Sequence, residues 1–235
     1  MRDARIRVYK FDELSEQAKE KAREDWVSKG GPYYWTREAR QTIEAFEKEF
    51  GVKIKDWSYS SYRYEFNLDT GSIDDDVLAL KGNRARAWFW NHHGKCLMSL
   101  RTRYFTHVNG KRIEAVSADS IEYHSKIEYS RVYDGTCPWT GYYLDCCALD
   151  PISHFCFGVE WSDKDEKRIP SSRKISVDDR NTVESLLKDA ADSLFSALKK
   201  DSEYQESMES FQDACEADGY EFTEDGKMWF MKEVA

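Results

Sequence analysis

The spacing of apolar residues changes along the chain, and this change constrains the fold more than any other feature of the sequence. In the first 50 residues, apolar side chains recur every three or four positions in two runs, which is the period of a helix with one buried face. The first helix is predicted to begin after Asp12 or Ser15 and to end near Ser28, and the second to end at Gly51. The apolar positions are Leu14, Ala18, Ala22, Trp26, Trp35, Ala39, Ile43, Phe46 and Phe50.

In the middle of the chain, aromatic residues alternate with polar ones, and alternation is the period of a β-strand. One strand is predicted between Trp57 and Phe66, and residues 88–133 are predicted to be β-structure or irregular. Asn109-Gly110 is the strongest turn signal because both residues tolerate positive φ. It predicts a hairpin whose strands end near Val108 and begin near Lys111.

Helical spacing returns after this region. A buried turn or short helix is expected at residues 144–157, and Ser176 is predicted to cap a long helix that contains Leu187 and Leu194. A second helix is predicted to end at Gly219, and Asp225-Gly226 predicts a terminal hairpin. The fold class is therefore α+β, with N-terminal helices, a central and mostly antiparallel aromatic-rich sheet, and acidic C-terminal helices with a terminal hairpin.

Two domains are predicted, namely a mixed α/β domain at 1–161 and an acidic helical region at 173–235, with a single domain as the alternative. Hydrophobic residues make up 40% of the 235 positions and aromatic residues 14%, a composition that excludes a largely disordered chain. No apolar run approaches the roughly 20 residues that a membrane helix needs. The first residues lack the apolar stretch of a signal peptide, so the protein is expected to stay in the cytoplasm, where it is made.

The net charge of −9 is distributed unevenly. The last 60 residues contain 16 acidic and 6 basic side chains, a net charge of −10, whereas the preceding 175 contain 28 acidic and 29 basic ones, a net charge of +1. Within that part, residues 81–113 contain eight basic side chains and no acidic one. A chain with a basic middle and an acidic end has an electrostatic field that steers charged partners.

The acidic residues crowd the predicted penultimate helix. Acidic pairs four positions apart repel each other by a few tenths of a kcal/mol, and no lysine lies within this segment to offset them. An acidic helix can imitate phosphates and occupy the basic groove of a nuclease or toxin, although a merely solvated helix is the alternative. The predicted partner is a basic or nucleic-acid-binding protein, contacted by Asp201, Glu203, Glu206, Glu209, Asp213, Glu216 and Asp218.

The basic middle segment supports a second hypothesis, a nucleic-acid-binding module. Cations hold phosphates and aromatic rings stack on bases, and this segment mixes both residue types. A pair of strands with an aromatic inner face and a charged outer face is the alternative. The candidate residues are Arg84, Arg86, Trp88, Trp90, Lys95, Arg101, Arg103, Lys111 and Arg112.

Catalytic and metal-binding patterns are weak. The sequence has no nucleophile-elbow, zinc-protease, Walker or dinucleotide-binding motif. Magnesium at Asp74, Asp75 and Asp76 is less favoured than the start of a short helix, because consecutive helical residues point about 100° apart. Zinc ligands are conceivable among a cysteine-rich group, but its spacing fits poorly and packing is favoured. No catalytic residue, metal or cofactor is therefore predicted, and the zinc candidates considered are Cys137, Cys146, Cys147, His154 and Cys156.

Four segments resemble a family that is common in bacteriophages and mobile elements and is often labelled an antitoxin of a toxin–antitoxin stability system. They are VYKFDELSEQAK at 8–19, GSIDDD at 71–76, CPWTGY at 137–142 with LDPI at 149–152, and YEFTEDG at 220–226. The resemblance implies a small accessory protein carried by a phage or plasmid, and it implies little chemistry. Together with the acidic end, it predicts a non-enzymatic protein that neutralises a toxin or a host defence effector, such as a CRISPR nuclease complex.

Overall fold

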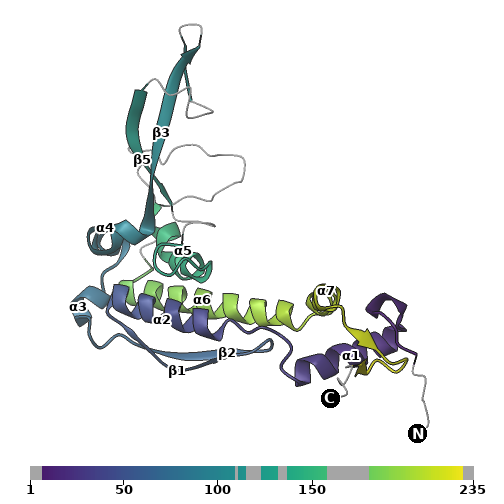
Figure 1. Ribbon diagram of the computed structural model, residues 1–235. Helices are drawn as coiled ribbons and strands as arrows, with labels where there is room; N and C mark the ends of the chain where they lie inside the picture. Colours follow the sequence, from purple (N-terminus) through teal and green to yellow (C-terminus); the bar gives the residue numbers. More distant parts are fainter. Residues whose placement is uncertain (1–6, 109–110, 115–122, 132–136, 158–179, 230–235) are drawn as a thin grey trace, which may run out of the picture. The chain divides into compact units, whose positions relative to one another are not determined.

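The computed structural model describes residues 7–108, 111–114, 123–131, 137–157 and 180–229 (Figure 1). Its helices and short antiparallel sheets confirm the predicted α+β class. The chain divides into two compact units. The first unit comprises Met1–Thr36, Ser58–Glu65 and Ser196–Ala235, and the second unit comprises Arg37–Trp57 and Phe66–Phe195. The predicted domain boundary between residues 161 and 173 lies outside the described residues.

In the first unit, both ends of the chain contribute to one structure. The short helix η1 (Phe11–Glu13) precedes α1 (Glu16–Ser28), and the side-chain oxygen of Ser15 accepts a 3.3 Å hydrogen bond from the Ala18 amide, as a capping residue should. Helix α7 (Met208–Asp218) ends at Gly219, whose φ of 65° is the left-handed stop expected from the sequence. Strands β6 (Glu221–Phe222) and β7 (Met228–Trp229) pair antiparallel and confirm the terminal hairpin.

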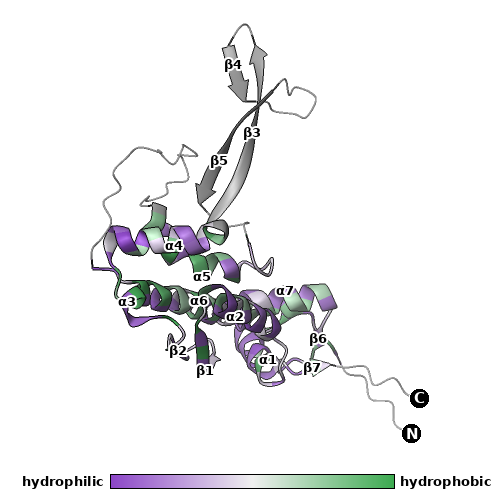
Figure 2. Ribbon diagram, turned by 90° about the vertical axis from the view of Figure 1, so that its left-hand side faces the viewer, coloured by the Kyte–Doolittle hydropathy of each residue, from purple (hydrophilic) through white to green (hydrophobic). Residues whose placement is uncertain are grey.

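The core of the first unit forms around Phe211, whose side chain is fully buried. The Phe211 ring lies 5.1 Å from that of Trp26 and 5.5 Å from that of Phe11, centre to centre. Burying a phenylalanine contributes roughly 1.5–3 kcal/mol. The apolar stripe of α1 predicted from the sequence therefore packs against α7, although Figure 2 shows that most of α1 is hydrophilic.

Five of the described helices lie wholly or partly in the second unit. These are α2 (Thr36–Phe50), α3 (Asp75–Leu78), α4 (Gly82–Leu97), α5 (Leu144–Phe157) and the first part of α6 (Val183–Gln205). Aromatic rings join them: Phe50 of α2 lies 6.3 Å from Phe89 of α4, and Phe66 stacks on Phe195 of α6 at 4.9 Å. The helices predicted at residues 35–50 and 144–157 are confirmed.

The strands form short sheets. Strands β1 (Lys53–Tyr59) and β2 (Tyr64–Asp69) make a two-stranded sheet, and β3 (Met98–Val108) lies between β4 (Lys111–Glu114) and β5 (Tyr123–Arg131). Val108 pairs with Lys111, so the two predicted strand ends are confirmed, while Asn109-Gly110 lies outside the described residues. The single strand predicted between Trp57 and Phe66 is instead a hairpin, in which the Ser60 amide donates 2.9 Å to the Arg63 carbonyl and Tyr62 occupies the turn.

Two further expectations are wrong. Residues 88–97 belong to helix α4 rather than to β-structure, because Ala85, Phe89 and His93 recur every four positions and are all buried. Burial of that stripe overrides the strand preference of the aromatic residues. Helix α6 begins at Val183 rather than after Ser176, because Thr182 and Ser185 cap it reciprocally with hydrogen bonds of 2.9 and 3.0 Å.

Within the described ranges, no helix combines the length and the apolar character needed to cross a membrane.

Candidate partner-binding surface

Helix α7 has one apolar face and one acidic face. Phe211 and Cys215 are buried in the core of the first unit. Glu209, Asp213 and Glu216 lie at positions i, i+4 and i+7 and are exposed. Because residues 201–226 contain ten carboxylates and no lysine or arginine, no cation within this segment compensates that face. We call Glu209, Asp213 and Glu216 the acidic face.

Other acidic residues that were predicted to contact a partner interact with neighbouring residues of the first unit. Glu203 forms a 2.5 Å ion pair with Lys199, and Asp201 is half-buried. A hydrogen bond with Asp218 raises the pKa of Tyr220. Within the acidic face itself, Glu216 accepts a 3.1 Å hydrogen bond from the side-chain amide of Gln212, a contact on the surface that leaves the carboxylate exposed.

The carboxylate of Glu206 joins three segments that are far apart in the sequence. One oxygen accepts a 2.8 Å hydrogen bond from the Tyr34 hydroxyl, and the other accepts a 2.7 Å bond from the Ser61 hydroxyl. The Glu206 backbone carbonyl accepts a 2.7 Å bond from the guanidinium of Arg23. Glu206 was predicted to contact a partner, but the structure places its carboxylate in an intramolecular network.

The segments that this network joins carry tyrosines that are exposed to solvent. Tyr62 follows Ser61 and is 86% exposed, and Tyr204 precedes Glu206 by two positions and is 45% exposed. Tyr34 is 36% exposed; burial of its hydroxyl, followed by the bond to Glu206, raises its pKa to about 12. Sequence analysis missed these residues as a group, because they come from three segments whose proximity only the folded chain reveals.

Tyr204 links the tyrosines to the acidic face. Its hydroxyl lies 3.5 Å from a carboxylate oxygen of Asp213. Desolvation, and then the charges of Asp213 and Glu209, raise the pKa of Tyr204. An aromatic ring and two carboxylates therefore occupy the same part of the first unit, an arrangement that suits a cationic side chain.

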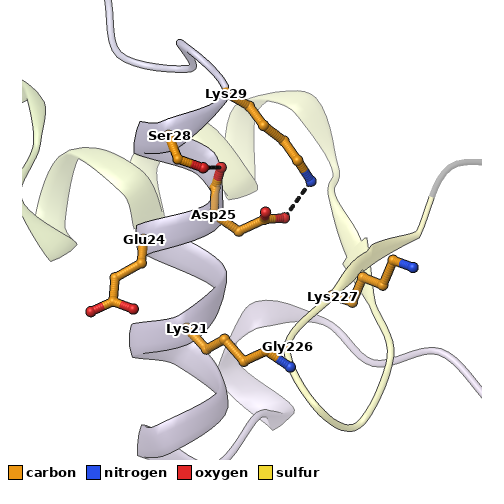
Figure 3. A pocket seen from close by; sticks show the side chains of 7 residues that line it. All are labelled: Lys21, Glu24, Asp25, Ser28, Lys29, Gly226 and Lys227. Atoms are coloured by element: carbon orange, nitrogen blue, oxygen red, sulfur yellow. Dashed lines mark hydrogen bonds and ion pairs between the residues drawn. The ribbon is translucent and has the colours of Figure 1, made fainter.

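A hollow of about 440 Å³ lies between α1 and the terminal hairpin (Figure 3). Charged side chains line it, but several neutralise one another: Lys29 pairs with Asp25, and Lys21 pairs with Asp225 at 2.7 Å. The hydrogen bonds that Asp225 accepts from Lys21 and Thr223 lower its pKa to about 2. This hollow offers salt bridges and no arrangement of a nucleophile with a base.

The basic segment is divided between a helix and strands. Helix α4 carries Arg84, which is exposed, and Trp90, which is 40% exposed, whereas Arg86 and Trp88 are half-buried. The remaining candidates are Lys95 on α4, Arg101 and Arg103 on β3, and Lys111 and Arg112 on β4. Arg101 pairs in register with the acidic Glu128 of β5. Nucleic-acid binding by this segment stays a prediction.

The candidate zinc ligands are Cys137, which precedes α5, and four residues on α5 itself. His154 and Cys156 lie two positions apart on α5, and the first is exposed while the second is buried. Burial raises the pKa of Cys156 and of Cys215 to about 12, which disfavours the thiolate that a metal or a nucleophilic reaction requires. Across the part of the chain that the structure describes, no group of three or more His, Cys, Asp or Glu side chains is arranged to hold a metal ion.

A cysteine, a histidine and a glutamate do meet in the second unit. The ring of His93 lies 3.0 Å from Glu49, and the Cys96 thiol lies 3.5 Å from the same carboxylate oxygen. Burial raises the pKa of the Cys96 thiol and lowers that of His93. Both shifts favour the neutral forms, so this group lacks the thiolate–imidazolium pair of a cysteine nucleophile.

The CPWTGY segment, one of those that carry the family resemblance, is organised by Asp145. The buried carboxylate accepts bonds of 2.9 Å from the Trp139 amide and 2.7 Å from both the amide and the hydroxyl of Thr140. Thr42 of α2 donates a further bond of 3.3 Å. Because every interaction of Asp145 described here joins it to the chain itself, the segment has a structural role in the second unit.

Comparison with protein-family models, with curated proteins and with solved structures finds no match.

Proposed function

We propose that this protein is a non-catalytic accessory protein that binds and neutralises a basic protein partner. The observation that carries the proposal is the acidic face of α7. Glu209, Asp213 and Glu216 lie along one side of a helix whose other side is anchored by Phe211 and Cys215. A row of carboxylates on a packed helix presents a negative field at fixed positions, which attracts and orients a basic groove.

The resemblance to the mobile-element family indicates what such a partner is. A toxin and a host defence effector, such as a CRISPR nuclease complex, are the two kinds of target that this resemblance favours. Both kinds include proteins that bind nucleic acid through basic surfaces. An acidic helix that occupies such a surface would block it by competition with phosphates.

The test begins with the full chain, tagged and expressed in a cell that carries its phage or plasmid. Proteins that co-purify are identified by mass spectrometry, and each is then mixed in purified form with the purified chain. We expect direct binding at 50 mM salt that weakens as salt is raised, because salt screens exposed charges. A chain that binds no purified candidate and no basic protein would contradict the proposal.

The acidic face is tested by changing Glu209, Asp213 and Glu216 together to lysine. The matched control changes three exposed acidic residues elsewhere, Asp12, Glu44 and Glu65, to lysine. Both variants change the net charge by the same amount. We expect the first to weaken binding at least about tenfold and the control to weaken it far less, because close charges dominate over distant ones. Equal losses in the two variants would exclude the acidic face as the contact.

Nucleic-acid binding is examined in the same samples. Gel shifts with single- and double-stranded DNA and RNA at two salt concentrations would show salt-sensitive binding if the basic segment acts. Loss of that binding on changing Arg84, Arg86, Arg101 and Arg103 to alanine would replace the proposed function with the alternative.

A further inference from the structure

Tyr34, Tyr62 and Tyr204 are exposed tyrosines of the first unit whose chain segments meet at Glu206, and we call them the tyrosine surface. The hydrogen bonds of Glu206 bring their segments together, since it binds Tyr34 directly and binds Ser61, the neighbour of Tyr62. Tyr204 lies in the last turn of α6, two positions before Glu206. Arg23 donates a hydrogen bond to the Glu206 carbonyl and so adds α1 to the same meeting point.

The exposure of these rings calls for a binding role. A single exposed aromatic residue is common on protein surfaces. Here, however, a hydrogen-bond network gathers three from distant segments and leaves them 36%, 86% and 45% exposed. Tyrosines supply large contact areas at low cost in conformational entropy, and a network that holds them in place lowers that cost further.

The charges around the tyrosine surface indicate the occupant. The Tyr204 hydroxyl lies 3.5 Å from a carboxylate oxygen of Asp213, and desolvation followed by the charges of Asp213 and Glu209 raises the pKa of Tyr204. The cation of Arg23 is compensated by a 2.5 Å ion pair with Glu20. The carboxylates beside Tyr204 therefore favour cations over phosphates at that end of the tyrosine surface, and the negative faces of the aromatic rings add to this preference.

We propose that the tyrosine surface binds arginine side chains of a basic protein segment. The inference rests on the proposed function and specifies how the partner is recognised. A guanidinium is planar and weakly hydrated, so it stacks on a tyrosine ring while its N–H groups donate to a neighbouring carboxylate. A lysine ammonium is compact and strongly hydrated and cannot do both as well. The acidic face attracts the basic segment, and the tyrosine surface makes arginine side chains bind more tightly than lysine side chains.

The experiment measures the binding of two fluorescein-labelled peptides, octa-arginine and octa-lysine, to the purified full chain by fluorescence anisotropy. Their charges are equal, so a difference in affinity reports the side chain and not the field. We expect octa-arginine to bind several-fold more tightly at 100 mM salt. Changing Tyr62 and Tyr204 together to alanine should weaken octa-arginine binding about tenfold and abolish the preference.

Two control variants separate ring contacts from folding. Changing Tyr62 and Tyr204 to phenylalanine retains both rings and should retain most of the preference. Changing Tyr143, an exposed tyrosine of the second unit, to alanine should leave both affinities unchanged. Tyr34 is not changed, because its hydroxyl holds Glu206 and a change would disturb the first unit.

The outcomes distinguish this inference from the proposed function. Equal affinity of the unmodified chain for the two peptides would overturn the inference. Unchanged octa-arginine binding by the alanine variant would also overturn it, and if lysines at Glu209, Asp213 and Glu216 abolished binding of both peptides, the acidic face would still stand. Absence of binding to either peptide, together with no basic partner in the co-purification, would overturn both.

Discussion

The hydroxyl of Tyr34 donates a 2.8 Å hydrogen bond to the carboxylate of Glu206, a residue 172 positions further along the chain. Ser61 donates to the other oxygen of the same carboxylate at 2.7 Å. One glutamate therefore ties the segment after α1 and the β1–β2 turn to the end of α6. This arrangement gives Glu206 a place in the architecture of the first unit, so the proposed partner contact is restricted to the acidic face of α7.

The first prediction concerns the stability contributed by Glu206. Changing Glu206 to alanine removes the acceptor of two hydrogen bonds and should lower the free energy of unfolding by about 1–3 kcal/mol, the range for bonds to a half-buried charged group. Glutamine at this position should have an intermediate effect because it retains one acceptor oxygen. Changing the exposed Glu209 to alanine is the control and should alter stability by less than about 0.5 kcal/mol. Urea unfolding measures the stability of all three variants. Similar losses of stability for the alanine variants at positions 206 and 209 would refute the structural role of Glu206.

The second prediction concerns Asp145. Its buried carboxylate accepts from two backbone amides and from the hydroxyls of Thr140 and Thr42. Changing Asp145 to alanine leaves buried donors without an acceptor and should cost about 3 kcal/mol or more. The exposed Glu44 of α2, in the same unit, serves as the control, and its change to alanine should cost less than about 1 kcal/mol. The denaturant midpoints of the two alanine variants measure these losses of stability. A small loss of stability on changing Asp145 would argue against its organising role.

The third prediction compares two glycines that both have positive φ. Gly226 has a φ of 81°, and a side-chain carbon there would lie 2.1 Å from the Ala18 carbonyl oxygen of α1. Gly219 has a φ of 65° and open space around it. Alanine at Gly219 should cost only the left-handed strain of about 1–2 kcal/mol. Alanine at Gly226 adds a clash with backbone and should cost clearly more, measured as a larger drop in melting temperature. Equal drops would show that the approach of the hairpin to α1 is not tight.

The fourth prediction concerns pH. Burial lowers the pKa of His93, against the opposing effect of Glu49, so the folded state holds the protonated form less well than the unfolded state does. The stability contributed by neutral His93 is present above the unfolded pKa of about 6.5 and is lost as pH falls through that value toward the lower folded pKa. Urea unfolding between pH 7.5 and 5 should therefore show a decline that is shallower in the variant with glutamine at His93. The exposed His92 provides the matched change, and an identical decline in both variants would count against burial as the cause.

Local patterns predicted the helices well. The apolar spacing placed α1 and α2. Ser15, one of the two predicted starts of α1, caps that helix, and Gly51 ends α2 as predicted, with a φ of 69°. Such features depend on residues within a few positions of one another. Residues 88–97 were assigned wrongly because aromatic residues favour strands locally, whereas burial of Phe89 and His93 makes this segment helical.

The candidate site likewise has one part that could be predicted from the sequence and one part that could not. The acidic face could be predicted, because three carboxylates spaced by four and three positions on a helix lie on one side of it. The tyrosine surface could not be predicted, because Tyr62 was placed in a strand and Tyr34 lay outside any pattern. Their proximity depends on Glu206, and a hydrogen bond across 172 positions leaves no periodic signal in the sequence.

The sequence by itself determined the α+β class, the positions of α1 and α2 and the concentration of negative charge in the last 60 residues. Periodicity, capping and charge are properties of neighbouring residues, so these features follow from local physical chemistry. Only the tertiary structure decided which carboxylates face solvent and which hold the chain together. Glu206 and Glu209 are three positions apart and chemically identical, and packing alone gives one an intramolecular network and leaves the other on the acidic face.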